Sequence, residues 1–490
     1  MPETPGTSHQ AVPVAPEAPA APQAPAAPAA GAKGRRLAWL DALRGFAALF
    51  VVFDHLSYDV LQHVRADVYQ FFDPGLYGVF VFFMVSGYIV PASLERKGSV
   101  RGFWVSRVFR LYPLYLVALV VAVLLWKVHL GLIAKTNYDG RTALLTHVLM
   151  LSNILGQQNA IDVVWTLSYE MAFYLLVTAL FVTGKHQRSS RWALVFAVAA
   201  AALGGVLPMT AISRTFLGTQ LVAELADLLI LGGVALAVTR HRLPKRVGAI
   251  LAGGTALLLV CFNGNWVHPY EALTILALMF TGTMLYRAER GDYPWRRAIP
   301  IAVVVFVLAS LSDLWSLSTW NVFSAVAGHA TYRQWLTSLL AAGLTFGVGL
   351  ACRHRKVPRV FAWLGLVSFS VYLLHPLLVE IYKRIPLTEH PHPLPEQLLL
   401  AAAFLAVLLA CCWLSHRFVE SSMQRQGRRF AAWLDTYLGP DTVLATAAGP
   451  GPAATAAPSP AAPAAPAAPT RASCRRETVW DQDGVHIGHP

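Results

Sequence analysis

Four ionisable side chains lie in the first apolar stretch of the sequence, LAWLDALRGFAALFVVFDH: Asp41, Arg44, Asp54 and His55. A charge inside a membrane helix is costly and marks a functional site by default. Arg44 and His55 are eleven residues apart. On one helix they lie within about 20° of the same face and about 16 Å apart along the axis. Asp41 precedes Arg44 by one turn and can pair with it. One helix face therefore carries a guanidinium near one end and an imidazole near the other.

The same residues also fit a structural role. Asp41 and Arg44 would then be an interfacial pair that reaches the inner headgroups. An apolar setting favours the neutral imidazole of His55, which can accept a proton. A hydrogen-bonded structural histidine would give the same pattern. This segment alone leaves both interpretations open.

Two arginines follow the second apolar stretch. That stretch contains FFMVSGYIV, with the polar residues Ser86 and Tyr88, and it leads into RGFWVSRVFRLYP. Arg107 and Arg110 are one helical turn apart in this segment. Two guanidinium forks on one face can bind a phosphate or pyrophosphate group. A positive-inside membrane anchor is the alternative interpretation.

Two later apolar stretches also contain ionisable groups. The segment WTLSYEMAFYLL places Glu170 near Trp165 and Tyr174. A buried glutamate needs a partner or is held protonated. The segment SFSVYLLHPLLVE contains Tyr372 and His375. A single histidine before a proline is usually a packing residue, so His375 is expected to support a site rather than to react.

The elements that carry these residues are expected to be membrane helices. Apolar residues make up 56% of the 490-residue chain and charged residues 13%, about half the charged fraction of a soluble domain. The mean hydropathy is +0.51. We therefore expect an all-α, polytopic membrane bundle of about 10–12 transmembrane helices. Its apolar blocks lie near 38–60, 75–94, 111–133, 164–183, 192–212, 221–239, 247–264, 270–286, 298–314, 334–352, 360–381 and 396–414.

Basic residues separate alternate blocks. The net charge is +13, and the lysines and arginines gather in every second connection, as in cytoplasmic loops under the positive-inside rule. This distribution argues against nucleic acid as the partner. It predicts a multi-pass protein of the cell membrane with both termini in the cytoplasm. The basic connections are 96–110, 185–191, 240–246, 287–297 and 353–359.

The two ends of the chain differ from the blocks between them. Residues 1–36 are rich in Ala and Pro, and so is the later part of 421–490, which begins with a short basic segment. Such segments bury too little apolar surface to order themselves, so we expect two disordered tails. Residues 37–420 are expected to form one membrane domain. The five cysteines show no metal-type spacing, so no metal site is predicted.

Five of these segments together resemble the acyltransferase type 3 family of integral membrane proteins, which O-acylate sugars, polysaccharides and natural products. They are the Arg-x10-His of DALRGFAALFVVFDH, then FFMVSGY, RVFRLYP, WTLSYE and YLLHP, in the order of the family. The resemblance covers about 37–420. The closing segment RFVESSM has Ser422 where the family has a proline, so the match is weaker there than in the motifs.

The resemblance implies transfer of an acyl group, commonly acetyl, from acyl-coenzyme A, with no permanently bound cofactor. It places the catalytic histidine at His55 and donor-binding arginines at Arg44, Arg107 and Arg110. The implied partners are acyl-coenzyme A, the lipid bilayer, and a carbohydrate or glycosylated small molecule as acceptor.

Two mechanisms are consistent with this assignment. His55 is a general base toward the acceptor hydroxyl, or it carries the acyl group itself. Glu170 is the favoured partner that orients the imidazole, with Asp54 as the alternative. A secondary transporter with a proton relay of Arg, His and Glu is the competing class, although no internal repeat is visible. The residues expected to support the site are Asp41, Ser86, Tyr88, Trp165 and His375.

Overall fold

The computed structural model describes residues 32–130, 140–320, 331–384, 393–439 and 441. In these residues every regular element is a helix, as the apolar blocks predict. The α-helices are α1 (Ala32–Ser57), α2 (Gln62–Val68), α3 (Pro74–Lys97), α4 (Val100–Lys127), α5 (Gly140–Val148), α6 (Trp165–Val182), α7 (Ser189–Leu203), α8 (Thr219–Ala237), α9 (Arg242–Phe262), α10 (Pro269–Arg290), α11 (Trp295–Trp320), α12 (Tyr332–Ala351), α13 (Arg359–Leu366), α14 (Ser368–Tyr382), α15 (Leu394–Ser415) and α16 (Ser421–Leu438). Three shorter helices are η2 (Asp162–Val164), η3 (Ile212–Leu217) and η6 (His416–Glu420).

Each predicted apolar block coincides with a helix, and the block 360–381 is divided between α13 and α14. Within the described ranges, eight helices are long and apolar enough to cross a membrane, or nine if the bent pair α13–α14 is one span. The protein is therefore a multi-pass helical membrane protein. Three other helices that carry a predicted block are not in this set, for local reasons. α7 has 15 residues, α1 carries Asp41, Arg44 and Asp54 within its apolar stretch, and α10 has Glu271 in its first turn with Arg287 and Arg290 in its last.

Helical residues extend into both terminal segments of the predicted domain division. α1 begins at Ala32, inside the segment 1–36 that was expected to be disordered. α16 occupies the start of the segment 421–490. The remaining predictions for the two tails fall on residues 1–31 and 442–490, which lie outside the described residues.

Local sequence signals set the ends of α3 and the start of α4. The carboxylate of Asp73 caps α3 by accepting a backbone N–H at 2.8 Å, and Pro74 follows at the first helical position. α3 ends at Gly98, whose φ of 61° lies in the left-handed region that glycine tolerates. Ser99 then caps α4. This tight connection places the arginines of α4 beside the end of α3.

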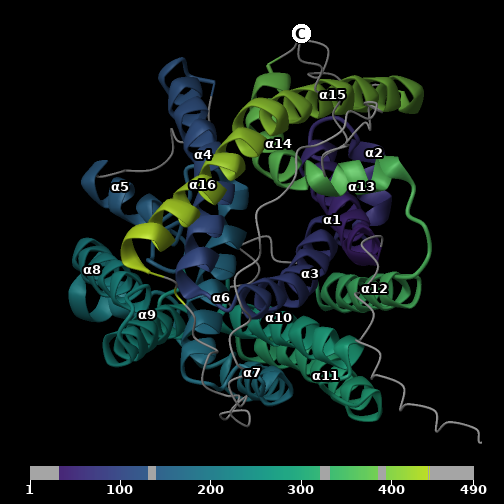
Figure 1. The fold of residues 1–490 in the computed structure, drawn as a ribbon. Helices are drawn as coiled ribbons and strands as arrows, with labels where there is room; N and C mark the ends of the chain where they lie inside the picture. Colours follow the sequence, from purple (N-terminus) through teal and green to yellow (C-terminus); the bar gives the residue numbers. More distant parts are fainter. Residues whose placement is uncertain (1–31, 131–139, 321–330, 385–392, 440, 442–490) are drawn as a thin grey trace, which may run out of the picture. The chain divides into compact units, whose positions relative to one another are not determined.

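Helix α1 packs closely against α3 and α13, which lie on either side of it in Figure 1. A Cβ on Gly365 of α13 would lie 2.0 Å from the carbonyl oxygen of Asp41. A Cβ on Gly78 of α3 would lie 2.6 Å from that of Ala47. Membrane helices approach one another through such small residues. The backbone of α1 is therefore held between two neighbours.

The α13–α14 pair bends by 65° at the break between the two helices. Ser368 Oγ donates to the carbonyl oxygen of Gly365 at 2.8 Å across the break, and Val367 is fully buried there. The bend directs the first turns of α14, with Phe369 and Tyr372, toward α1 and α6.

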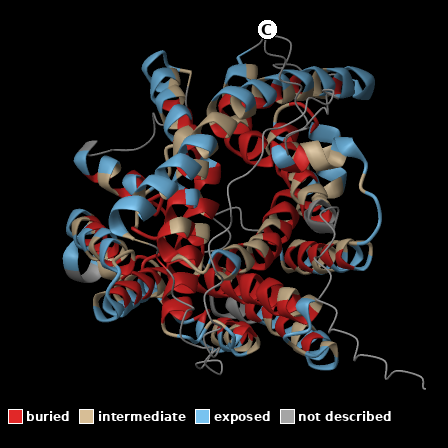
Figure 2. Cartoon of the chain, in the orientation of Figure 1, coloured by how far each residue is buried: buried red, intermediate tan, exposed pale blue. Residues whose placement is uncertain are grey.

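Figure 2 shows buried residues concentrated on α3, α6 and α10. Nearly every residue of α6 is buried. The outer helices α8, α12 and α15 instead expose leucines, among them Leu228, Leu344 and Leu399. In a membrane these apolar faces contact lipid chains.

Contacts between the connections define two ends of the bundle. At one end, Arg287 donates to the carbonyl oxygen of His186 at 2.9 Å, Arg353 pairs with the last turn of α10 at 3.1 Å, and Lys245 pairs with Asp441. These contacts join the connections that are basic in the sequence, and we call this the basic end. The opposite end contains the connection between α1 and α3 and the connection before α10.

Candidate active site

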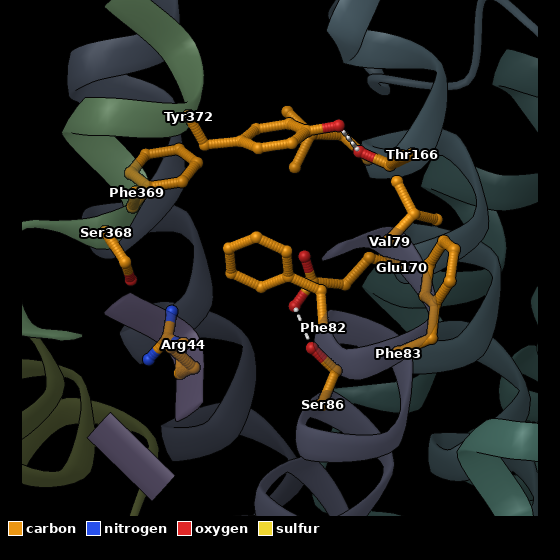
Figure 3. Close-up of a pocket in the computed structure, with 11 residues that line it drawn as sticks. Arg44, Val79, Phe82, Phe83, Ser86, Thr166, Glu170, Ser368, Phe369 and Tyr372 are labelled. Carbon is orange, nitrogen blue, oxygen red and sulfur yellow. Dashed lines mark hydrogen bonds between the residues drawn. The ribbon is translucent and has the colours of Figure 1, made fainter. Parts of the chain in front are cut away.

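A small cavity of about 50 Å³ lies where α1, α3, α6 and α14 meet. Figure 3 shows Arg44 and Ser368 on one side, with Glu170 and Ser86 facing them. The guanidinium of Arg44 makes no hydrogen bond or close ion pair with any described residue. It is therefore free to bind an anion or a carbonyl oxygen that enters the cavity.

Arg44 belongs to a cluster of charges that continues along α4 toward the basic end. Arg110 interacts electrostatically with Arg44 and with Asp41. The expected pair of Asp41 and Arg44 is an electrostatic interaction of this kind, not an ion pair at contact distance. Arg107 is buried, with its guanidinium 5.0 Å from the ring centre of Tyr174. Its Nε has no hydrogen-bond partner in the described part of the chain.

A larger cavity, of about 420 Å³, lies toward the opposite end. His55 of α1 lines it together with residues from α6, α14 and the connection before α10. Val79 and Tyr372 line both cavities, and the Tyr372 hydroxyl is hydrogen-bonded to Thr166 at 2.7 Å. The two cavities therefore meet at these side chains, with Arg44 in the smaller one and His55 in the larger one.

The hydrogen bond of His55 fixes which of its nitrogens can act as a base. Nδ1 lies 3.0 Å from the carbonyl oxygen of Val51, one helical turn earlier. A carbonyl oxygen only accepts, so Nδ1 carries the proton of the neutral ring and Nε2 keeps its lone pair. No hydrogen bond to Nε2 is formed by the residues the structure describes. Nε2 is the atom available to take a proton or an acyl group.

Asp54 is the carboxylate beside this histidine. Its Oδ2 lies 3.7 Å from Nδ1 of His55. Arg65 donates to Oδ1 of Asp54 at 3.3 Å. The guanidinium of Arg65 lies in turn against the rings of Tyr58 and Tyr69, 3.3 and 3.6 Å from their centres. Asp54 can therefore stabilise a positive charge on His55.

Glu170, the partner favoured from the sequence, is not brought to His55. Its Oε1 accepts hydrogen bonds from Ser86 at 3.3 Å and from Tyr174. α6 runs from the opposite end toward the basic end, so Glu170 lies farther from the opposite end than Trp165 does. It lies at the level of the smaller cavity. Glu170 is thus placed with the arginine cluster rather than with the imidazole.

A second histidine, His375 of α14, faces His55. The two ring centres are 4.9 Å apart in an edge-to-face arrangement. His375 is fully buried, and its Nδ1 lies 2.9 Å from the carbonyl oxygen of Val371. Its Nε2 has no hydrogen-bond partner among the described residues. The neutral ring therefore presents a second unprotonated nitrogen next to His55.

Ser86 and Tyr88 point to different sides of α3, the helix that carries both. Ser86 lies in the smaller cavity. Tyr88 packs edge-on against Trp39 and Tyr286, with ring centres 5.5 and 5.3 Å apart. Side chains at positions i and i+2 of a helix point about 200° apart around its axis. Only one of Ser86 and Tyr88 can therefore face the cavity. Trp165, in contrast, lines the larger cavity.

Several residues of the larger cavity were not singled out from the sequence, among them Asp73, Asp162 and Trp266. These three lie just outside the predicted apolar blocks, where single polar or aromatic residues are common. Burial raises the pKa of Asp73 to about 6, and the nearby Asp54 carboxylate adds to this effect. Only the folding of the connections over the end of α1 shows that these residues belong to the site.

Both cavities lie in the part of the chain that matches a known family. The model of that family, described as an acyltransferase domain, matches residues 37–416. The chain belongs to this acyltransferase family. The match confirms the resemblance of the sequence motifs, and it ends close to the expected domain boundary at 420.

Bacterial acyltransferases are among the curated relatives of this family member. The chain is 24% identical over 424 residues to YrhL of Bacillus subtilis (strain 168), whose name assigns it provisionally as a peptidoglycan O-acetyltransferase. It is 23% identical over 416 residues to the peptidoglycan O-acetyltransferase OatA of Listeria monocytogenes. These alignments cover 81% and 79% of this chain and 56% of each relative. Over 149 residues it is 32% identical to the acyltransferase MdmB of Streptomyces mycarofaciens, covering 29% of this chain and 38% of the relative.

The chain therefore spans about half the length of the first two relatives. No solved structure matches this chain.

Proposed function

We propose that this chain is a membrane-bound O-acyltransferase that moves an acyl group, most simply acetyl, from acyl-coenzyme A to a hydroxyl of a carbohydrate or glycosylated acceptor. The observation that carries the proposal is the pair of cavities that meet at Val79 and Tyr372, with Arg44 in one and His55 in the other. A donor from one end and an acceptor from the other would meet at His55. Family membership and the names of the peptidoglycan O-acetyltransferase relatives support acetyl transfer to a carbohydrate.

The arginine cluster suits the proposed donor. Coenzyme A carries its negative charge on phosphates, and guanidinium forks bind phosphate oxygens through two parallel hydrogen bonds. Arg107 and Arg110 lie in the first half of α4, and Arg44 lies in the smaller cavity, farther from the basic end. About 16 Å separate Arg44 from His55 along the axis of α1. The thin pantetheine arm would cross the junction at Tyr372 while the phosphates stay with the arginines.

In the proposed reaction, Nε2 of His55 takes the proton from the acceptor hydroxyl as the hydroxyl oxygen attacks the thioester carbonyl carbon. The new C–O bond forms, the C–S bond breaks, and the proton then passes from the imidazolium to the sulfur of coenzyme A. A general base of this kind contributes about 10²–10⁴-fold to the rate. Asp54 stabilises the imidazolium from 3.7 Å. An acyl-histidine intermediate would use the same nitrogen.

The basic end is proposed to face the cytoplasm, where coenzyme A is found. Lysines and arginines are enriched in cytoplasmic connections, and the structure gathers the basic connections at one end. α1 begins at that end and α16 lies there, so both termini would be cytoplasmic in the cell membrane. The larger cavity would then open toward the outside, where cell-surface carbohydrate is available.

The test is an assay of the purified full-length protein in detergent with acetyl-coenzyme A and a hydroxylated acceptor. Release of coenzyme A that depends on the acceptor is the expected result. His55→Gln should abolish it, whereas His354→Gln, at an exposed histidine of the basic end, should retain it. Wild-type transfer by His55→Gln would contradict the assignment. Vectorial uptake of a solute into liposomes without covalent change would indicate a transporter instead.

A second measurement separates the two mechanisms. Mass spectrometry of the intact protein after addition of donor alone detects a mass increase of one acyl group if His55 carries the acyl group. No mass increase, together with acceptor-dependent turnover, indicates that His55 acts as a general base.

A further inference from the structure

The larger cavity is acidic, although the chain as a whole carries a net charge of +13. One ammonium group, that of Lys383, lines it together with His55. The carboxylates that line it belong to Asp54, Asp73, Asp162 and Glu380. A charged acceptor beside His55 would therefore meet mainly negative charge.

The basic groups near this cavity are already bound to carboxylates. Lys383 pairs with Glu380 at 3.0 Å and with Asp59 at 3.6 Å. Arg65 donates to Asp54 and is stacked between two tyrosine rings. Neither group is placed to neutralise an anion that enters the cavity.

Asp162 and Asp73 are the two cavity carboxylates with no cation at contact distance among the described residues, and of the two only Asp162 is exposed, whereas Asp73 caps α3. Asp162 begins η2 and is exposed to the cavity. Its carboxylate forms no ion pair with any described residue. His55, Glu380 and Lys383 are the groups with which it interacts electrostatically. A charge on an acceptor bound near His55 therefore lies within the field of Asp162.

Two tryptophans give the same cavity flat apolar surfaces. Trp165 and Trp266 both line it, edge-to-face, with ring centres 6.2 Å apart. Trp266 is 53% exposed, which leaves part of its indole open to a ligand. The C–H face of a sugar ring packs on such a surface, while its hydroxyls donate to carboxylates. A volume of about 420 Å³ is also in the usual range for a small-molecule site.

We infer that the acceptor bound in this cavity is a sugar unit without negative charge, that a cationic acceptor such as an amino sugar is preferred, and that acidic acceptors are rejected. The inference rests on the proposed function, because it treats this cavity as the acceptor site. The charge of Asp162 supplies much of the preference for cationic over anionic acceptors. A unit charge about 6 Å from a carboxylate changes binding by roughly a hundredfold at an effective dielectric of about 20, and solvent in an open cavity lowers this toward tenfold.

The experiment compares three β-glucosides whose ring hydroxyls are all intact and whose aglycones differ in charge. The aglycones are methoxyethyl, trimethylammonioethyl and carboxymethyl, so none of them adds an amine or a hydroxyl that could itself be acylated. The full-length protein in detergent receives saturating acetyl-coenzyme A, and kcat/KM is measured for each glucoside. We expect the cationic glucoside to exceed the anionic one by roughly tenfold or more, with the neutral glucoside between them.

A variant assigns the effect to Asp162. Asp162→Asn keeps the shape and removes the charge, and it should shrink the cationic-to-anionic ratio severalfold. The matched control is Asp292→Asn, an exposed carboxylate at the basic end that pairs with Arg290. It should keep the wild-type ratio. The order found in the wild-type protein tests the inference even if the Asp162 variant does not fold.

The outcomes separate the inference from the proposed function. Transfer to all three glucosides with similar kcat/KM, or a preference for the anionic one, overturns the inference and leaves the proposed function standing. An unchanged ratio in a folded Asp162→Asn protein also overturns it. Absence of acyl transfer to every glucoside contradicts the proposed function and the inference with it.

Discussion

Arg107 is a buried arginine at the entrance of the proposed donor site. Its Nε has no hydrogen-bond partner in the described ranges, and Tyr174 covers the guanidinium. Arg107→Lys keeps the charge but loses the planar fork that binds phosphate. We expect the KM for acetyl-coenzyme A to rise about tenfold to hundredfold, because a hydrogen bond to a charged group contributes about 1.5–3 kcal/mol. Steady-state kinetics at saturating acceptor measure this change, and kcat should change less.

The control for this prediction is Arg296→Lys, at an exposed arginine of the same end, and it should leave the donor KM unchanged. If Arg107→Lys also has a wild-type KM, Arg107 does not contact the donor.

His375 is expected to position the ring of His55 and to stabilise its positive charge. Its buried Nε2 lacks a partner among the described residues, and its ring stands edge-on to that of His55. His375→Phe keeps an aromatic ring but removes the lone pair. We expect kcat to fall about tenfold to hundredfold, the equivalent of one hydrogen bond to a charged group, with little change in the donor KM. A change in the pH profile of kcat would separate this role from simple packing. A kcat within twofold of wild type would show that His375 only fills space.

For single residues, the sequence predicts positions that are set within one helix. It misses contacts that depend on how two helices pack against each other. The spacing of Arg44 and His55 fixes their depth and face on α1 whatever surrounds them, and they line the two neighbouring cavities, Arg44 the smaller one and His55 the larger one. The partner of His55 depends on how far another helix is shifted along its axis. Glu170 therefore lies level with Arg44, and Asp54, a sequence neighbour, lies beside His55.

The helix α16 is attached to the start of α4, which it crosses in Figure 1. The Asp441 carboxylate accepts hydrogen bonds from the N–H of Arg101 at 2.8 Å and from Ser99 at 3.1 Å, and it pairs with Lys245. Arg101 also pairs with Asp435 of α16 at 3.2 Å. This network holds α16 over the turns of α4 that carry the donor-site arginines.

Loss of the buried charge in this network should destabilise the protein more than loss of the exposed one. The side chain of Asp441 is 1% exposed and that of Asp435 is 52% exposed. Asp441→Asn leaves the buried ammonium of Lys245 without its anion and weakens the acceptor of the Arg101 backbone N–H, at a cost of about 3–5 kcal/mol. Asp435→Asn should cost about 1 kcal/mol or less. The midpoint temperature of thermal unfolding in detergent is measured for both variants, with size-exclusion chromatography to monitor the folded protein. Equal midpoints would show that Asp441 does not hold the segment.

The sequence predicts the existence of the helices better than the way they are joined. Each apolar block is a helix, because about twenty apolar residues in lipid have few other structures available. The break of 65° between α13 and α14 was not predicted, because it falls within the apolar block 360–381. The helical start of 421–490 was also missed, because its polar composition gives no membrane signal.

The charge pattern of the whole molecule makes a prediction about its orientation. Asp67 is exposed at the opposite end and Asp292 at the basic end. In a background without native cysteines, Asp67→Cys should react with a membrane-impermeant maleimide on intact cells. Asp292→Cys should react only after the cells are permeabilised, because basic connections remain in the cytoplasm. The reverse labelling pattern would place the donor arginines outside the cell and contradict a cytoplasmic acyl-coenzyme A donor.

The central claim is that one passage joins the arginine cluster to the imidazole of His55. An experimental structure of the full-length protein with bound coenzyme A tests it most directly. We expect the phosphates at Arg107 and Arg110, the pantetheine arm between Val79 and Tyr372, and the sulfur within reach of Nε2 of His55. Density for coenzyme A elsewhere, or a wall of side chains that closes His55 off from the bound donor, would contradict the account.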